Sequence, residues 1–160
     1  MSSRQNAGPR QKVLFICTHN SARSQMAEGI LNSLYGNRFE AYSAGTEPTT
    51  PNPLAVSAMS EIGIDISHGR SKHFSEFVGK DIDYVVTLCN EAKENCPFFP
   101  GAKEYAHHGV EDPAANTSSH EALASFRQVR DELKDWIMKA FGDQTADRVD
   151  KGTSFKLQLE

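Results

Sequence analysis

The sequence predicts an α/β fold in which a mainly parallel sheet carries helices on both faces. Three observations predict it. Strand-like and helix-like segments alternate along the chain, and such alternation gives right-handed crossovers between parallel strands. The first strand-like segment, residues 12–16, is continuously apolar after Lys12, as expected for a parallel strand that is covered on both sides. The 160 residues are also close to the length of one domain, about 150 residues.

The first elements are predicted from apolar spacing. Residues 12–16 form a strand, and residues 22–35 form a helix because their apolar side chains recur with helical periodicity. These side chains share one stripe: Met26, Ala27, Ile30, Leu31, Leu34 and Tyr35. Residues 39–43 form a second strand.

The next helix is predicted from its boundary residues. Asn52 is a favourable N-cap, Pro53 suits the first turn, and Gly63 follows the end of the helix. Its apolar face consists of Val56, Met59 and Ile62.

The second half of the chain contains two further strands and a long helix. Residues 83–88 form a strand that leads directly to Cys89, and residues 104–108 form a weaker fourth strand. The last helix opens with a capping box at residues 118–121 and stops at Gly142.

The domain boundaries follow from loss of periodicity. Residues 1–10 are predicted to be a flexible N-terminal tail, residues 11–142 a single catalytic domain, and residues 143–160 a C-terminal tail. The N-terminus is polar and has no apolar core of a secretory signal. No apolar run is long enough to cross a bilayer. We therefore expect a cytoplasmic protein that is a monomer and has no membrane partner.

Net charge and cysteine content limit the classes of function that the chain can have. The formal net charge is −4 and the pI is about 5.9, which does not favour nucleic-acid binding, because such proteins normally gather basic residues on one face. The chain has three cysteines. In a reducing compartment an odd number indicates reactive or buried thiols more than a static disulfide framework.

A cysteine, five residues and an arginine join the first strand to the first helix. The loop consists of Cys17, Thr18, His19, Asn20, Ser21, Ala22, Arg23 and Ser24. Its N–H groups and the helix N-terminus can surround a tetrahedral oxyanion. The guanidinium of Arg23 can bind two oxygens of that anion. The same positive field, with the hydroxyl of Ser24, favours the thiolate of Cys17 as a nucleophile.

Alone, the spacing of this cysteine and arginine would be weak evidence, since Cys17 could equally be a small buried hydrophobe. The agreement of strand, loop, helix and Ser24 favours the anion site. In parallel sheets, ligands bind beyond the carboxyl ends of the strands, and Cys17 and Cys89 both lie at such ends.

Three segments carry a family resemblance: residues 17–29 (CTHNSARSQMAEG), residues 42–45 (YSAG) and the pair Asp112-Pro113. They resemble the low-molecular-weight tyrosine phosphatase superfamily, and more closely its thioredoxin-coupled arsenate reductase branch. The resemblance covers about residues 12–141. It implies a three-layer α/β/α fold with a four-stranded parallel sheet, in agreement with the four strand-like segments.

The resemblance also implies roles. In both branches Cys17 is the nucleophile, Arg23 binds the oxyanion, and Asp112 protonates the departing oxygen. In a reductase, Cys17 attacks arsenate, Cys89 then attacks the sulfur of Cys17, and Cys96 attacks Cys89 to leave a Cys89–Cys96 disulfide. Thioredoxin then supplies the electrons, and no tightly bound cofactor is expected. Phosphate and sulfate are expected as analogues of arsenate.

The spacing of the last two cysteines predicts a local rearrangement. Residues 91–95 are compatible with a short helix, and positions seven apart in a helix differ by about 10.5 Å along its axis. A disulfide needs Cα atoms within roughly 7 Å. The helix must therefore unwind before Cys89 and Cys96 can bond, and Pro97 limits how firmly it is anchored.

Some members of the branch hold a potassium ion beside the anion loop. The matching positions are Asn20, Glu28, Ser43 and Lys72, and at the last of these an aspartate would be expected. Two arrangements remain open. Either the Lys72 ammonium occupies or neighbours the cation position and replaces potassium electrostatically, or Lys72 points into solvent and the site is absent.

Three other functions fit the sequence less well than arsenate reduction. A phosphatase for aryl or small phosphate esters needs only Cys17, so the presence of Cys89 and Cys96 favours the reductase. Two local departures from the phosphatases also favour it: Gln25 replaces a usual proline, and small residues follow Pro113. An oxyanion- or thiol-sensing module would not need a nucleophile together with a proton donor. A metal site is not expected, because the cysteine spacing fits no common zinc pattern and His107-His108 is more typical of partly exposed surface.

Overall fold

The computed structural model describes residues 9–90, 98–115 and 119–142. Its strands are β1 (Gln11–Cys17), β2 (Phe39–Gly45), β3 (Tyr84–Thr87) and β4 (Glu104–His107). They form one sheet in the order β2-β1-β3-β4, and every neighbouring pair is parallel. The predicted α/β fold with a four-stranded parallel sheet is therefore confirmed.

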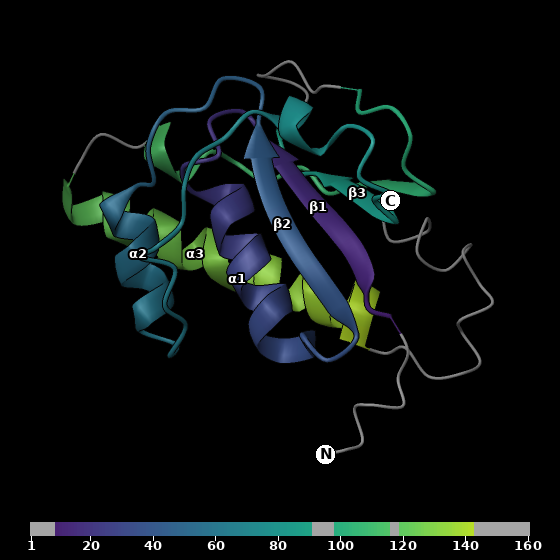
Figure 1. Ribbon diagram of the computed structural model, residues 1–160. Helices are drawn as coiled ribbons and strands as arrows, with labels where there is room; N and C mark the ends of the chain where they lie inside the picture. The colour runs from purple at the N-terminus through teal and green to yellow at the C-terminus, as the bar shows by residue number, and fades with distance from the viewer. Residues whose placement is uncertain (1–8, 91–97, 116–118, 143–160) are drawn as a thin grey trace.

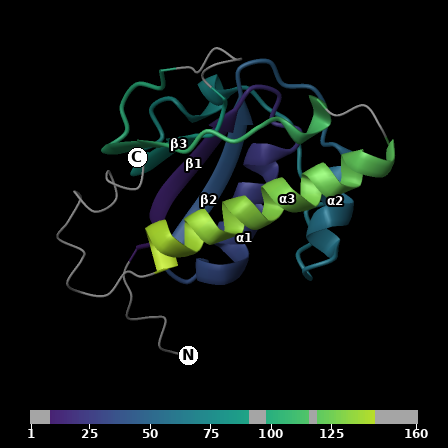
Figure 2. The ribbon, with the colours of Figure 1, turned by 180° about the vertical axis from the view of Figure 1, so that it is seen from behind.

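Both faces of the sheet are covered, although unequally. The helices α1 (Arg23–Tyr35), α2 (Pro53–Ser60) and α3 (Ser119–Ile137) lie together on one face (Figure 1). Seen from behind, α3 runs across that layer in front of α1 and beside α2 (Figure 2). On the other face, the 3-10 helix η2 (Phe74–Phe77) and Phe99 pack against the sheet.

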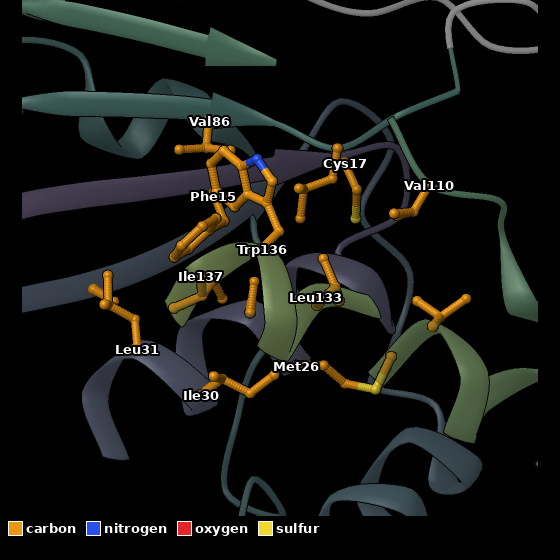
Figure 3. Close-up of a cluster of buried hydrophobic side chains, with 14 of the residues drawn as sticks. Phe15, Cys17, Met26, Ile30, Leu31, Val86, Val110, Leu133, Trp136 and Ile137 are labelled. Atoms are coloured by element: carbon orange, nitrogen blue, oxygen red, sulfur yellow. The ribbon is translucent and has the colours of Figure 1, made fainter. Parts of the chain in front are cut away.

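The larger core lies between the sheet and the three helices. Side chains from β1, α1 and α3 meet there, and Figure 3 shows Phe15, Leu31 and Ile137 among them. Cys17 lies at one end of this cluster near Val110. The core therefore continues to the carboxyl end of β1, and the first cysteine is built on a rigid element rather than on a free loop.

The predicted elements agree with the structure to within a residue or two. The side chain of Asn52 accepts a hydrogen bond from the backbone N of Leu54, 2.8 Å away, and so caps α2 as expected. Two details differ. Leu34 is 39% exposed, because the last turn of α1 extends past the core, and α3 continues after Ile137 as a short π-helix, Met138–Gly142. Within the described part of the chain, no helix combines the length and apolar character that crossing a membrane requires.

Candidate functional site

The carboxyl ends of three strands bring the candidate site residues together. Cys17 ends β1 and pairs with Gly45, the last residue of β2. Cys89 lies two residues beyond the end of β3, and the preceding Leu88 donates its backbone N–H to the carbonyl of Ile16, 2.8 Å away. Both cysteines are buried. The two cysteines therefore follow adjacent strands. The sequence predicted that both lie at strand ends, but not that the strands are neighbours.

The anion loop is held from outside by the segment after β2. The carbonyl oxygens of Thr18, His19 and Ser21 accept backbone hydrogen bonds of 2.8, 3.1 and 2.8 Å from Glu47, Thr49 and Asn52. A trans peptide places its N–H opposite its C=O. The N–H groups that follow these outward carbonyls are therefore directed toward the inner side of the loop, as an oxyanion site requires.

Close packing fixes the shape of this loop. Asn20 has a positive φ of 50°, a conformation that asparagine tolerates better than most residues. Gly45 is needed beside it, because a Cβ at that position would lie 2.5 Å from the carbonyl oxygen of Thr18 and 2.9 Å from the backbone N of Asn20. Helix α1 then begins at Arg23 with no side-chain cap, which leaves its N-terminus available to an anion.

The candidate nucleophile has one polar neighbour on the same loop. The sulfur of Cys17 lies 3.0 Å from the hydroxyl oxygen of Ser24. That oxygen accepts a hydrogen bond from the side-chain amide of Asn20 at 2.7 Å, and it can donate to the carbonyl of Ala44 only at 3.4 Å. The hydroxyl hydrogen is therefore best placed to reach a Cys17 thiolate, which a hydrogen bond would stabilise.

Arg23 is buried, with an exposed fraction of 2%. Its Nη1 donates to the carbonyl of Val110 at 3.2 Å, and its Nη2 lies 3.9 Å from a carboxylate oxygen of Asp112. The other oxygen of Asp112 accepts from the backbone N of Ala114 at 3.0 Å, at the start of the 3-10 helix η3 (Pro113–Ala115). The structure thus places Asp112 next to the guanidinium, while its side chain is 29% exposed.

The other loop residue singled out in the sequence, His19, faces outward. Its ring nitrogen Nδ1 lies 3.3 Å from the carbonyl oxygen of Glu47. It therefore belongs to the outer support of the loop and not to its interior.

The two described cysteines differ in redox state. Cys17 is a free thiol, whereas Cys89 is disulfide-bonded. Cys96 and the predicted short helix at residues 91–95 lie outside the described residues. Next to Cys89, the side chain of Asn90 donates to the carboxylate of Glu111 at 2.7 Å, which ties the start of this segment to the loop that leads from β4 to Asp112.

The four residues of the predicted cation position lie close together, but they do not suit a potassium ion. The side-chain oxygen of Asn20 accepts from the backbone N of Lys72 at 3.0 Å and faces its ammonium at 3.5 Å. The hydroxyl of Ser43 donates to Glu28 at 2.5 Å. A positive charge therefore stands where an oxygen ligand would be needed.

Two contributors to the site were not identified from the sequence. Asn20 also accepts two bonds at its backbone carbonyl, from the side-chain amide of Gln25 at 3.1 Å and from the hydroxyl of Ser71 at 2.7 Å. The sequence marked Gln25 as unusual, because it replaces a usual proline, but gave no indication of its contact with Asn20. Nothing in the sequence marks Ser71, because its approach depends on how a distant loop folds back.

Comparison with known proteins identifies the family. The family model for low molecular weight phosphotyrosine protein phosphatase matches residues 12–151. Arsenate reductase 1 of Staphylococcus epidermidis is 45% identical over 129 residues, which cover 78% of this chain and 91% of the relative.

Solved structures agree with this assignment. A structure described as an arsenate reductase in the phosphate binding state superposes with a TM-score of 0.73 at 32% identity, covering 84% of this chain and 99% of the other. A thioredoxin-dependent arsenate reductase of Corynebacterium glutamicum gives a TM-score of 0.58 at 32% identity, covering 84% of this chain and 66% of the other. The chain therefore belongs to the low molecular weight phosphotyrosine protein phosphatase family, and within it to the arsenate reductases.

Proposed function

We propose that this chain reduces arsenate to arsenite through Cys17, Cys89 and Cys96, and that thioredoxin restores the thiols. The observation that carries the proposal is the arrangement at the strand ends. A free Cys17 lies 3.0 Å from the Ser24 hydroxyl within an anion loop, and a second, disulfide-bonded cysteine follows the adjacent strand.

The first step forms a bond between sulfur and arsenic. Arsenate binds to the loop N–H groups and Arg23, and the thiolate of Cys17 attacks the arsenic atom. One arsenic–oxygen bond breaks, and the oxygen leaves as water after Asp112 protonates it. Arsenic is still in its +5 state in this adduct. The proximity of Asp112 to Arg23, 3.9 Å, supports this role because both groups then act on the same anion.

The second step transfers the electrons. The thiolate of Cys89 attacks the sulfur of Cys17, a disulfide forms, and the sulfur–arsenic bond breaks with its electron pair remaining on arsenic. Arsenic leaves in its +3 state as arsenite. Two thiolates have then become one disulfide, so the two electrons balance.

The third step clears the anion loop. Cys96 attacks Cys89, the bond moves to Cys89 and Cys96, and Cys17 is released as a thiolate. A free Cys17 beside a disulfide-bonded Cys89 is the state that this step produces. A dithiol protein then reduces the remaining disulfide, and the thioredoxin dependence of the Corynebacterium relative supports thioredoxin as that protein.

Aryl phosphate hydrolysis is the second candidate function, favoured by the family model. It would use the same loop, Arg23 and Asp112, with water instead of Cys89 attacking the Cys17 adduct. The distinction therefore depends on the second cysteine.

The test couples the enzyme to thioredoxin, thioredoxin reductase and NADPH. Arsenate-dependent loss of NADPH is measured beside release of phenol from an aryl phosphate. Cys89→Ser should abolish the first and preserve the second, and Cys17→Ser should abolish both. Loss of both activities in Cys89→Ser, or a wild-type chain that hydrolyses the ester without oxidising NADPH, would reject the relay.

Peptide mapping after exposure to arsenate supplies an independent check. The relay predicts a peptide in which Cys89 is bonded to Cys96, and a Cys96→Ser variant that stops after one turnover with Cys17 bonded to Cys89. A Cys96→Ser variant with unchanged turnover would show that the third step is not used.

A further inference from the structure

The ammonium of Lys72 is surrounded by oxygen atoms. It donates to the carbonyl oxygen of Arg70 at 2.6 Å and lies 3.5 Å from the side-chain oxygen of Asn20. The backbone N of Lys72 donates to that same oxygen at 3.0 Å. Lysine normally extends its flexible chain into water, so a half-buried lysine that contacts the anion loop twice requires an explanation.

The contacts continue from Lys72 to the sulfur of Cys17. Because the oxygen of the Asn20 amide accepts from Lys72, its nitrogen is directed to the other side, where it donates to the hydroxyl of Ser24 at 2.7 Å. Ser24 then lies 3.0 Å from the sulfur of Cys17. Each bond in this series orients the next, so the direction of the amide determines which way the Ser24 hydroxyl can donate.

A buried acid accompanies the lysine. Glu28 is bonded to Ser43, and burial raises its pKa, whereas the Ser43 hydrogen bond and the charge of Lys72 lower it. Burial lowers the pKa of Lys72, and Glu28 and Glu76 oppose this effect while Arg70 adds to it. The two half-buried charges therefore support each other, as partly desolvated ions must.

We propose that Lys72 is a positioning residue of this site, and that its ammonium fixes Asn20 and, through Ser24, favours the reactive thiolate of Cys17. The lysine performs the task of a bound cation, so the chain has no need of one. The proposal uses Cys17 as the nucleophile of the proposed function, but it does not depend on which reaction follows.

The first experiment needs no variant. The rate of iodoacetamide alkylation of Cys17 at pH 7, followed by mass spectrometry of the reduced protein, is compared in KCl and NaCl of equal ionic strength. Thermal melting is recorded in both salts. The proposal expects the same rate and the same Tm in both, whereas a rate or Tm that rises with potassium alone would overturn it.

Three variants then test the lysine itself. Lys72→Met should slow alkylation of Cys17 by about threefold to tenfold, because loss of the ammonium frees the Asn20 amide and weakens the Ser24 hydrogen bond to the reactive thiolate. Lys72→Arg should restore most of the rate because it restores the charge. Lys80→Met is the matched control, since Lys80 borders the same surface hollow and its side chain has no described contact with Asn20.

In a fourth variant, potassium should reverse the loss of Cys17 alkylation rate. Lys72→Asp places a carboxylate among the oxygens of Asn20, Glu28 and Ser43, a donor set that suits a hard cation. Its alkylation should be slow in NaCl and recover in KCl, and its Tm should rise with potassium. Recovery in neither salt, together with an unchanged rate in Lys72→Met, would reject the role of the lysine.

These readouts separate this proposal from the proposed function. Alkylation requires neither arsenate nor thioredoxin. If the lysine variants behave as expected and arsenate reduction is absent, only the relay fails. If arsenate is reduced but the alkylation rate of Cys17 does not change with the charge at position 72, only the positioning role of Lys72 is wrong.

Discussion

Arg23 donates a hydrogen bond from its guanidinium to the backbone carbonyl of Val110, 3.2 Å away, on the segment that leads from β4 to Asp112. This bond fixes the plane of a buried guanidinium at the floor of the anion loop. It also joins two parts of the site that are 87 residues apart in the sequence. The orientation of Arg23 is thus set before any anion binds.

Arg23→Lys should keep the charge and lose the activity. An ammonium cannot bond Val110 and present a planar pair of N–H groups to the anion at the same time. We expect kcat/KM for arsenate to fall by about 10²–10³-fold, the usual cost of losing one oriented donor. Steady-state kinetics in the thioredoxin-coupled assay measures it, and a fall below tenfold would show that orientation contributes little.

Ser24→Ala removes the hydroxyl beside Cys17. Because this hydroxyl lies 3.0 Å from the sulfur, the arsenate reduction rate should fall by about tenfold, which corresponds to one hydrogen bond to a charged group. Ser33→Ala is the matched control, since Ser33 lies on the exposed side of the same helix, α1. Equal losses in both variants would contradict a direct effect on Cys17.

Gly45→Ala should displace the anion loop. The added methyl would lie 2.5 Å from the Thr18 carbonyl oxygen and 2.9 Å from the backbone N of Asn20, and both neighbours are backbone atoms that cannot rotate away. We expect the free energy of unfolding to fall by about 1–3 kcal/mol. Stabilisation by added phosphate should also be lost. Thermal melting with and without phosphate measures both, and an unchanged phosphate effect would show that the loop tolerates the shift.

The only tryptophan of the chain should report the protonation of His108. Trp136 stacks on its ring at a centroid distance of 5.0 Å and an interplanar angle of 10°. Burial, with a smaller effect from His107, lowers the pKa of His108 below its ordinary value of about 6.5. A stacked imidazolium quenches indole fluorescence, so the emission should be constant near pH 7 and fall only well below pH 6.5.

The same shift has a consequence for stability. Since the unfolded chain binds a proton at His108 more readily than the folded protein does, the stability from this group is complete above about pH 6.5. It falls as the pH drops toward the lower folded pKa. His108→Gln should remove both the fluorescence change and this part of the pH dependence. A fluorescence midpoint at or above pH 6.5 would contradict the direction of the shift, even with Glu132 only 3.5 Å from the ring.

Much of the site was predictable because its chemistry is local. Cys17, Arg23 and Ser24 lie within one strand–loop–helix segment, so their spacing, taken together with the strand and helix patterns around them, indicates that they share a loop. The strands were predictable for a similar reason, since residues 12–16 and 83–88 each carry a short, mainly apolar run that is typical of a strand in a covered sheet. Leu34 was placed wrongly because periodicity does not show where the core ends along a helix.

The contacts that hold the loop were not predictable, because they join distant segments. Gln25, Ser71 and Lys72 all bond to Asn20, and two of them approach it from a loop about 50 residues away in the sequence. Their positions depend on how the chain returns after α2, for which hydrophobic periodicity gives no information. The resemblance grouped Lys72 with Asn20, Glu28 and Ser43 at one cation position, but only the fold shows which oxygen atoms its ammonium contacts.

The left-handed turn at Asn20 and its surrounding hydrogen bonds give the loop its shape through contacts within the protein. Such a preformed receptor recognises a tetrahedral dianion by size and charge, and phosphate matches arsenate closely in both. None of the described contacts distinguishes arsenic from phosphorus at the centre of the anion. Discrimination must then come from reactivity, because a sulfur bond to arsenic can release its electrons to that atom whereas a bond to phosphorus does not. Abundant cellular phosphate should accordingly act as a competitor that slows detoxification without being consumed.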